Sequence, residues 1–427
     1  MDPSPQTIPH TSTSSASIPH AAAASASPAI VAAMDAALAA ARTGVRGANP
    51  LVGAAVIAPD GTVITGHHAG AGTPHAEPTA IRAAQAAGID LTASTLCVTL
   101  EPCSHHGRTP PCTDLILKTG IPEVVLASAD PNPAAAGGAA RLRAAGVRVT
   151  TGVREDEALA LNARWLRAVG ERRPFVTLKI AQSLDGRIAA ADGTSQWITS
   201  PASRARVHDL RARVDAVVVG TGTALADDPR LTARPTAEAA TAPEAGQSSE
   251  AHPVSASSAA ATAPLTQPIP VVIGMRDLDP DSHLAQDPRA IHLRTHDPLE
   301  ALTNLKGRGI DHVLMEGGAT LAGALVRADL VDELELHIAP LLLGDGLPGL
   351  ADLGITTLTE AIRWQPDPVE PLSRMPQTGT AVPPGAGSAD PGPPGARPES
   401  APANPDTILR LIPHPSPTNH PSHPKGS

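Results

Sequence analysis

The sequence predicts an α/β protein with two folded domains, and three observations support this class. Apolar strand-like runs alternate with helix-like runs along most of the chain, a rhythm typical of largely parallel sheets that helices cover on both faces. A length of 427 residues suggests two or three domains. Three segments are rich in Ser, Thr, Pro, Gly and Ala and have too few apolar side chains to form a core: 1–27, 235–268 and 370–404.

These segments divide the chain. We expect a disordered tail at 1–27, a first domain at 28–172, a second domain at 173–415 and a short tail at 416–427. The second domain contains the insertions 235–268 and 370–404, which we expect to be disordered.

In the first domain, periodicity and turn residues predict alternating helices and strands. The expected helices are 29–42, 77–87, 112–119, 139–146 and 155–168, and the expected strands are 51–58, 94–100, 123–128 and 147–152.

The second domain begins after Pro174 with the same alternation. Its expected helices are 203–213 and 319–327, and its expected strands are 175–183, 214–220, 270–274, 312–318, 333–340 and, beyond the second insertion, 407–413.

Charge and hydropathy limit the partners. Lys and Arg total 32 against 42 Asp and Glu, so the formal net charge is 32 − 42 = −10. A nucleic acid held by a basic surface is therefore not expected, although a small phosphorylated ligand needs only one or two cations. No apolar run approaches the roughly 20 residues that cross a bilayer, and the N-terminus lacks the pattern of a secretory signal. We expect a cytoplasmic protein without a membrane partner.

The three cysteines, Cys97, Cys103 and Cys112, lie within 16 residues and indicate a metal site rather than disulfides. His75 with Cys103 and Cys112 gives one imidazole and two thiolates, three ligands for tetrahedral zinc with a fourth position open for water. Cys97 lies inside the strand expected at 94–100, and we interpret it as a buried apolar residue.

Glu77 stands two residues after His75 and fits a general acid/base rather than a ligand of a soft metal site. An HxE sequence followed by a Pro-Cys and a second Cys is the order of zinc-dependent nucleobase deaminases. Because Pro78 disfavours helical geometry in the residue before it, His75 and Glu77 must lie at the very start of the helix.

Longer motifs resemble one family, the bifunctional deaminase–reductases of riboflavin biosynthesis. In the first half they are NPLVG (49–53), GTPHAE (72–77), TLEPCSH (99–105), GRTPPCTD (107–114) and DPNP (130–133). In the second half they are LKIAQSLDGRIA (178–189), SQWIT (195–199), DDPRLTAR (227–234) and EGGA (316–319). The eight residues between Cys103 and Cys112 distinguish this family from cytidine and transfer-RNA deaminases.

The resemblance implies a cytidine-deaminase-like three-layer α/β/α domain followed by a dihydrofolate-reductase-like α/β domain. The first would hydrolytically deaminate 2,5-diamino-6-(5-phosphoribosylamino)pyrimidin-4-one. The second would use NADPH to reduce the ribosyl chain, giving 5-amino-6-(5-phosphoribitylamino)uracil. Asn49 and His68 match positions near the deaminase substrate, whereas His105 and His106 are not expected as ligands. Family analogy also implies a homo-oligomer.

Carried over residue by residue, the resemblance also places contacts in the reductase half. The implied NADPH contacts are Ala181, Trp197, Thr223, Asp227, Gly318, Ala319, Thr320, Leu321, Ala322, Gly323 and Ala324. The implied substrate contacts are Ser195, Arg211, Leu231, Arg234 and Glu316. Lys179 lies on the expected strand beside SLDG, and we expect it near the substrate for that reason. Arg211 and Arg234 suit a phosphate, which guanidinium groups bind bidentately. The glycine-rich turns at 220–223 and 316–321 are by themselves weak evidence for a nucleotide.

Gly274 departs from the family, which usually has Asp at this position after the strand at 270–274. This change and the insertions 235–268 and 370–404 leave open a second hypothesis, a deaminase with a degenerate reductase domain. A third hypothesis, from another class, is a non-catalytic scaffold that zinc stabilises.

Overall fold

The structure, a computed structural model, describes residues 26–105, 110–132, 136–234, 267–367, 372–374 and 406–414. The segments predicted to be disordered lie almost wholly outside these residues. One part of that prediction is wrong: Leu372–Arg374, inside 370–404, forms strand β15 and pairs with β16. No helix among the described residues is long and apolar enough to cross a membrane.

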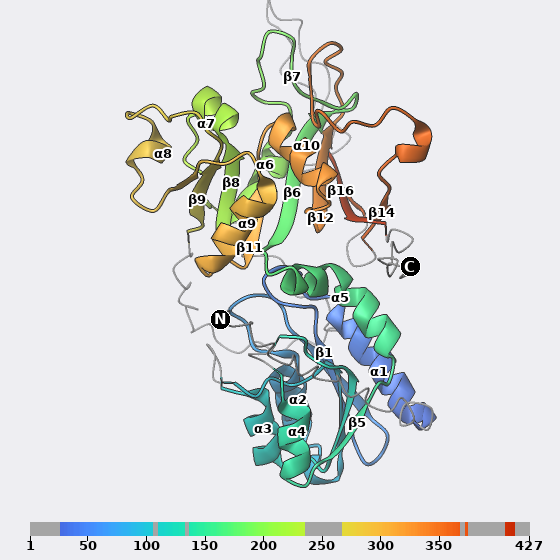
Figure 1. Cartoon of the computed structure of the whole chain (residues 1–427). Coiled ribbons are helices and arrows are strands. Elements are labelled where there is room, and N and C mark those ends of the chain that lie inside the picture. The colour runs from blue at the N-terminus through green and yellow to red at the C-terminus, as the bar shows by residue number, and fades with distance from the viewer. Residues whose placement is uncertain are drawn as a thin grey trace, which may run out of the picture. The chain divides into compact units, whose positions relative to one another are not determined.

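The chain forms two compact units, which we describe separately (Figure 1). The first contains the chain up to Gly44, Val52–Ala69 and Pro74–Leu161. The second contains Val45–Leu51, Gly70–Thr73 and the chain from Asn162 onward. Helix α5 (Glu155–Gly170) carries the chain from the first unit into the second.

The first unit is a five-stranded sheet in the order β2-β1-β3-β4-β5. Its strands are β1 (Gly53–Ile57), β2 (Val63–His67), β3 (Thr95–Leu100), β4 (Glu123–Ser128) and β5 (Arg148–Thr151). Strand β2 was not predicted, and it pairs antiparallel with β1, as β1 does with β3. Only β3, β4 and β5 are parallel to one another. The expectation of a largely parallel sheet therefore holds for these three strands of the first unit and not for β1 and β2.

Helices cover this sheet, as predicted. They are α1 (Pro28–Ala41), α2 (Ala76–Ala86), α3 (Cys112–Thr119) and α4 (Gly138–Ala144), with a 3-10 turn at Leu91–Ala93. Helix α1 approaches β1 so closely that a Cβ on Gly53 would lie 1.9 Å from the Ala37 carbonyl oxygen. A core made mainly of Ala, Val, Leu and Ile joins the sheet to α2, α3 and α4. Small side chains thus set the short helix-to-sheet distance in a unit whose core lacks large aromatic residues.

The second unit has a nine-stranded sheet in the order β10-β9-β8-β11-β6-β12-β16-β14, with β15 also paired to β16. Its strands are β6 (Phe175–Ser183), β8 (Ala216–Gly220), β9 (Ile269–Ile273), β10 (Ile291–Leu293), β11 (His312–Met315), β12 (Glu333–Ala339), β14 (Trp364–Pro366), β15 and β16 (Thr407–Pro413). The pairs from β10 to β12 are parallel, and β16 is antiparallel to its neighbours. The predicted strand 407–413 is therefore confirmed, with Leu409 opposite Leu336.

Two apolar clusters cover the parallel strands of this sheet. One contains residues of α9 (Pro298–Gly307) and α10 (Ala319–Arg327), and the other residues of α6 (Pro201–Arg211), α7 (Thr221–Asp227) and α8 (His283–Gln286). The sequence did not predict α7, α8 or α9. A two-stranded sheet of β7 (Arg187–Ala189) and β13 (Leu347–Pro348) and a 3-10 turn at Leu358–Glu360 complete the unit.

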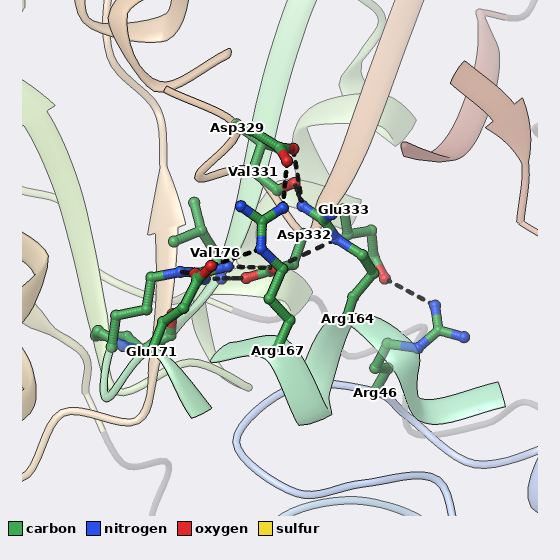
Figure 2. A network of polar contacts seen from close by, with 11 residues as sticks. Arg46, Arg164, Arg167, Glu171, Val176, Asp329, Val331, Asp332 and Glu333 are labelled. Carbon is green, nitrogen blue, oxygen red and sulfur yellow. Dashed lines mark hydrogen bonds and ion pairs between the residues drawn. The ribbon is translucent and has the colours of Figure 1, made fainter. Parts of the chain in front are cut away.

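A network of ion pairs ties the C-terminal half of α5 to the loop before β12 within the second unit (Figure 2). Arg173 and Asp332 are fully buried and form two hydrogen bonds of 2.6 and 2.9 Å. Asp332 also accepts the Val176 N–H at 2.9 Å, which fixes the start of β6. Arg164 and Arg167 pair with the half-exposed Asp329 at the rim of the network.

We expect Asp332→Asn to destabilise the second unit by about 3 kcal/mol, because it leaves the buried Arg173 charge with Glu171 as its one remaining ion-pair partner. Urea unfolding followed by tryptophan fluorescence measures this, since Trp165, Trp197 and Trp364 all lie in the second unit. The matched control Asp329→Asn removes a half-exposed charge and should cost at most about 1 kcal/mol. Equal losses for the two variants would contradict the importance of the buried pair.

Candidate zinc centre and reductase site

His75 and Glu77 lie at the start of α2, as the proline argument predicts. His75 is the N-cap with extended backbone angles (φ −67°, ψ 168°), and Glu77 is in the first turn. Pro78 occupies the third helical position, where a missing N–H costs no intrahelical hydrogen bond. The Thr79 hydroxyl donates to the His75 carbonyl at 2.8 Å and fixes this turn.

The loop that carries Cys103 follows the end of β3 and is held by backbone donors. The Glu101 carboxylate accepts the N–H groups of Ala139 at 2.8 Å and Asp130 at 3.2 Å. A Cβ on Gly138 would lie 1.9 Å from the Pro102 carbonyl oxygen, so glycine is required for the start of α4 to pack on this loop. Glu101 thus has a structural role that the sequence analysis did not assign.

The three predicted zinc ligands come together. Cys112 is the first residue of α3, and the donor atoms of His75, Cys103 and Cys112 lie within 4.8 Å of one another. His75 Nδ1 is 3.3 Å from Cys112 Sγ and 3.7 Å from Cys103 Sγ. Ligands about 2.0–2.3 Å from a tetrahedral zinc ion are roughly 3.5 Å apart, so the donor set fits the metal. The predicted triad is also the one His/Cys/Asp/Glu group with metal-binding spacing found among the described residues.

The polarity of the site favours deprotonated sulfur and a protonated acid. A hydrogen bond from Cys112 lowers the pKa of Cys103 and correspondingly raises the pKa of Cys112, so the pair shares one proton when no metal is bound. The hydrogen bond with Cys103 raises the pKa of His75. Glu77 is 3% exposed, and burial raises its pKa. A zinc ion would displace the protons of the two thiols and bind His75 as neutral imidazole, because its ligands bind in deprotonated form.

The other residues predicted around this centre differ in their placement. His68 is buried, and its ring stands edge-on to His75 with centroids 5.4 Å apart. Its Nδ1 is 3.0 Å from the Pro74 carbonyl oxygen. Asn49 lies in 45–51, which belongs to the second unit, and His106 lies outside the described residues. Cys97 is fully buried in β3, and burial raises its pKa to about 12, which supports its interpretation as an apolar core residue.

In the second unit, Arg211 and Glu316 form a bidentate ion pair. Arg211 ends α6, Glu316 follows β11, and the two N–H···O distances are 2.6 and 2.8 Å. Arg211 also donates to the Thr232 carbonyl at 3.1 Å. Arg234 is exposed, with its guanidinium 3.5 Å from His208 Nε2. Arg234 is therefore the freer of the two cations predicted to bind phosphate.

The two glycine-rich turns meet, although they are far apart in the sequence. The Gly318 N–H donates to the Thr223 hydroxyl at 3.1 Å, and a Cβ on Gly220 would lie 3.8 Å from the Leu321 side chain. Gly318 is the N-cap of α10 and supplies no side-chain cap to the first-turn N–H groups. Free N–H groups at a helix N-terminus attract phosphate, so this arrangement fits a dinucleotide.

The remaining predicted contacts are dispersed over the second unit. Ala181 and Lys179 lie on β6, and Trp197 is 68% exposed and stacks under Arg204 at 4.5 Å. Ser195 is partly exposed, Asp227 ends α7, and Leu231 is buried with φ +50°. Within α10, Ala322 packs in the core and Gly323 abuts the Ala351 carbonyl, so only the first turn of this run offers its backbone to a ligand.

One set of polar residues near Lys179 was missed. Glu335 and His337 on β12 are fully buried and hydrogen-bonded to each other at 3.0 Å. In the sequence, these two residues belong to the alternation ELELH at 333–337. This alternation is typical of a strand with one solvent-exposed face, so it did not indicate their burial.

Comparison with known proteins gives the family. Residues 29–128 match the cytidine and deoxycytidylate deaminase zinc-binding region, and residues 174–373 match the RibD C-terminal domain. The riboflavin biosynthesis protein RibD of Mycobacterium tuberculosis is 43% identical over 325 residues, which cover 75% of this chain and 88% of that protein. The chain belongs to the RibD family.

Solved structures of RibD proteins are similar to this chain in fold. Acinetobacter baumannii RibD matches with a TM-score of 0.62 at 31% identity, covering 90% of this chain and 99% of that one. A diaminohydroxyphosphoribosylaminopyrimidine deaminase/5-amino-6-(5-phosphoribosylamino)uracil reductase from Thermotoga maritima matches with a TM-score of 0.57 at 28% identity over the same shares. The predicted fold classes are confirmed. As a RibD protein, the chain is a bifunctional deaminase and reductase of riboflavin biosynthesis that uses zinc and NADPH.

The unusual Gly274 has a local structural reason. Its φ is +136°, and a Cβ there would lie 2.6 Å from the Thr221 hydroxyl at the start of α7. Its carbonyl lies 2.9 Å from His292 Nε2, which holds the end of β9 beside β10. The backbone here takes a conformation that a side chain disfavours.

We expect Gly274→Ala to destabilise the second unit by about 1–3 kcal/mol through backbone strain, in addition to the contact with Thr221. The control Gly307→Ala at the end of α9 meets no atom within 4 Å and should be neutral or stabilising by about 0.5–1 kcal/mol. Tryptophan-monitored urea unfolding compares the two. A Gly274→Ala protein as stable as wild type would show that the glycine is not needed for this conformation.

Proposed function

We propose that the chain deaminates 2,5-diamino-6-(5-phosphoribosylamino)pyrimidin-4-one and then reduces the ribosyl chain of the product to give 5-amino-6-(5-phosphoribitylamino)uracil. The observation that carries this proposal is the three-ligand donor set with Glu77 buried beside it. Three protein ligands leave a coordination position open, as catalytic rather than structural zinc sites do. The activity named for the Thermotoga maritima relative supports the choice of substrate.

In the deaminase unit, His75, Cys103 and Cys112 hold the metal and Glu77 moves protons. When bound, zinc supplies a water of lowered pKa. Glu77, buried beside these ligands, would act as the general base that accepts a proton from the attacking water. Glu77 then returns protons to the ring nitrogen and to the departing ammonia. His68 and Asn49 orient the pyrimidine in this proposal.

In the reductase unit, cations hold the substrate phosphate and the glycine-rich turns hold the cofactor. Arg234, together with Arg211, binds the phosphate, and Lys179 and Glu316 contact the ribosyl chain with Ser195 and Leu231. The first turn of α10 binds NADPH with Thr223, Asp227, Trp197 and Ala181. NADPH supplies the hydride, so the protein needs only to orient it toward the ribosyl carbon.

We also propose a cytoplasmic location, a small-molecule substrate in place of nucleic acid or membrane, and a homo-oligomeric assembly. The three cysteines are free thiols, which suits a reducing compartment. The assembly rests on family analogy alone.

The proposal is tested by a two-stage assay on the purified chain. Ammonia release is measured first without NADPH, and NADPH oxidation is measured after its addition. We expect Glu77→Gln to keep one zinc per chain and to lose about 10²–10⁴-fold in ammonia release, because general acid/base catalysis is removed. NADPH oxidation on separately supplied deaminated substrate should stay at the wild-type rate.

Two other results would overturn the proposal in different ways. Ammonia release without NADPH oxidation in the wild-type protein would mean a deaminase with a degenerate reductase unit. Bound zinc without either activity would mean a zinc-stabilised scaffold.

A further inference from the structure

One face of β12 is polar and yet buried. Glu333, Glu335 and His337 alternate with Leu334 and Leu336, which join the apolar core on the other face. The exposed fractions of Glu333, Glu335 and His337 are 4%, 0% and 0%. Burial of ionisable groups is costly unless each group is paired and hydrogen-bonded, so this face must have a specific set of partners.

Both carboxylate oxygens of Glu335 are occupied by donors. Oε1 accepts from Arg206 Nε at 2.9 Å and from His337 Nε2 at 3.0 Å. Oε2 accepts from Arg410 Nη2 at 2.8 Å and from Arg206 Nη2 at 3.3 Å. Burial raises the pKa of Glu335, but the hydrogen bond from His337 and the charges of Arg410 and Arg206 outweigh it and hold the pKa well below its usual range. Glu335 is therefore a permanent negative charge.

His337 is fixed in one neutral form between two partners. Since Glu335 is ionised and can only accept, Nε2 of His337 carries the proton, and Nδ1 accepts from the Ser203 hydroxyl. Burial lowers the pKa of His337. Ser203 is itself fully buried, so this Ser–His–Glu arrangement is not a nucleophile open to a substrate.

Lys179 lies directly across from Glu335 in the parallel pairing of β6 with β12. Among the described residues no hydrogen bond or ion pair to the Lys179 ammonium is found. Burial lowers its pKa, and the nearby negative charges of Glu316 and Glu335 act in the opposite direction. Lys179 therefore has an acid beside it whose oxygens are already taken by other donors.

We propose that Glu335 and His337 are positioning residues of the reductase: Glu335 keeps Lys179 protonated, and His337 helps to occupy the Glu335 oxygens so that the ammonium stays free for substrate. This inference rests on the proposed contact between Lys179 and the substrate. The charged and titratable groups that act on Lys179 come from α6, β12, the residue after β11 and the residue before β16: Arg211, Glu316, Glu335, His337 and Asp406. Arg206 and Arg410 contact Glu335 itself.

The first test is the pH dependence of NADPH oxidation on deaminated substrate by the full chain with Glu335→Gln. Loss of the negative charge lowers the pKa of Lys179. The protonated form, which binds substrate, is then lost at a lower pH, so the alkaline limb of kcat/KM should move down by about one pH unit or more. Ammonia release by the same preparation reports on the unaltered deaminase unit.

His337→Leu tests the second half of the proposal and remains informative if Glu335→Gln does not fold. It leaves Oε1 of Glu335 with Arg206 as its one remaining donor, so that this oxygen can also pair with Lys179. We expect KM for the deaminated substrate to rise about tenfold without a downward shift of the alkaline limb, because the Glu335 charge remains. The control Leu336→Ala removes core contacts from the same strand and should lower the unfolding temperature while it leaves the alkaline limb in place.

The outcomes separate the inference from the function on which it rests. An unmoved alkaline limb in Glu335→Gln, or an unchanged KM in His337→Leu, overturns the positioning role if Lys179→Met has lost NADPH oxidation. Wild-type NADPH oxidation in Lys179→Met overturns the proposed substrate contact itself, and the inference with it.

Discussion

The burial of three acidic residues close together in the sequence sets the conditions for the assembly of the second unit. Asp332, Glu333 and Glu335 lie at or within β12 and are almost inaccessible to solvent. Each needs a cation, because an unpaired buried carboxylate is too costly to keep ionised. The cations come from four different parts of the chain: Arg46 in 45–51, Arg173 before β6, Arg206 in α6 and Arg410 in β16. The three buried carboxylates therefore have all these cations as partners only when the four segments are in place.

This requirement explains how segments distant in the sequence become part of one sheet. Arg410 lies between Glu333 and Glu335 and brings β16 onto β12 from beyond a long insertion. Arg46 reaches both Glu333 and Asp367, so residues 45–51 pack with the second unit although they precede β1 of the first. The same constraint brings the Glu335 charge next to Lys179. Structural pairing and the reductase site thus share the polar face of β12.

The zinc centre depends less on distant segments, because its residues all lie between positions 75 and 112. The HxE sequence starts a helix, Cys103 follows a strand and Cys112 starts the next helix, so each donor lies at the end of an element and the packing of these elements brings the three together. Ligand chemistry then restricts the choice of metal and mechanism, since two thiolates and an imidazole suit zinc and Glu77 does not compete as a ligand. The sequence could therefore predict every residue of the centre. Its supports, such as Glu101 and Gly138, become visible only in the folded loop.

What the sequence by itself determined is the part that depends on local pattern: the α/β class, most of the long helices and strands, the donor set and the position of Glu77 before Pro78. Short elements such as α7, α8 and β10 were missed because they are too brief for periodicity to register. Tertiary structure alone decided the antiparallel place of β2, the meeting of Thr223 with Gly318, and the burial of Glu335 and His337. The ELELH alternation is equally compatible with a face in water. Arg206 from α6 and Arg410 from β16, the neighbouring strand, pair with Glu335 and make this face a buried network of charges, which no local signal encodes.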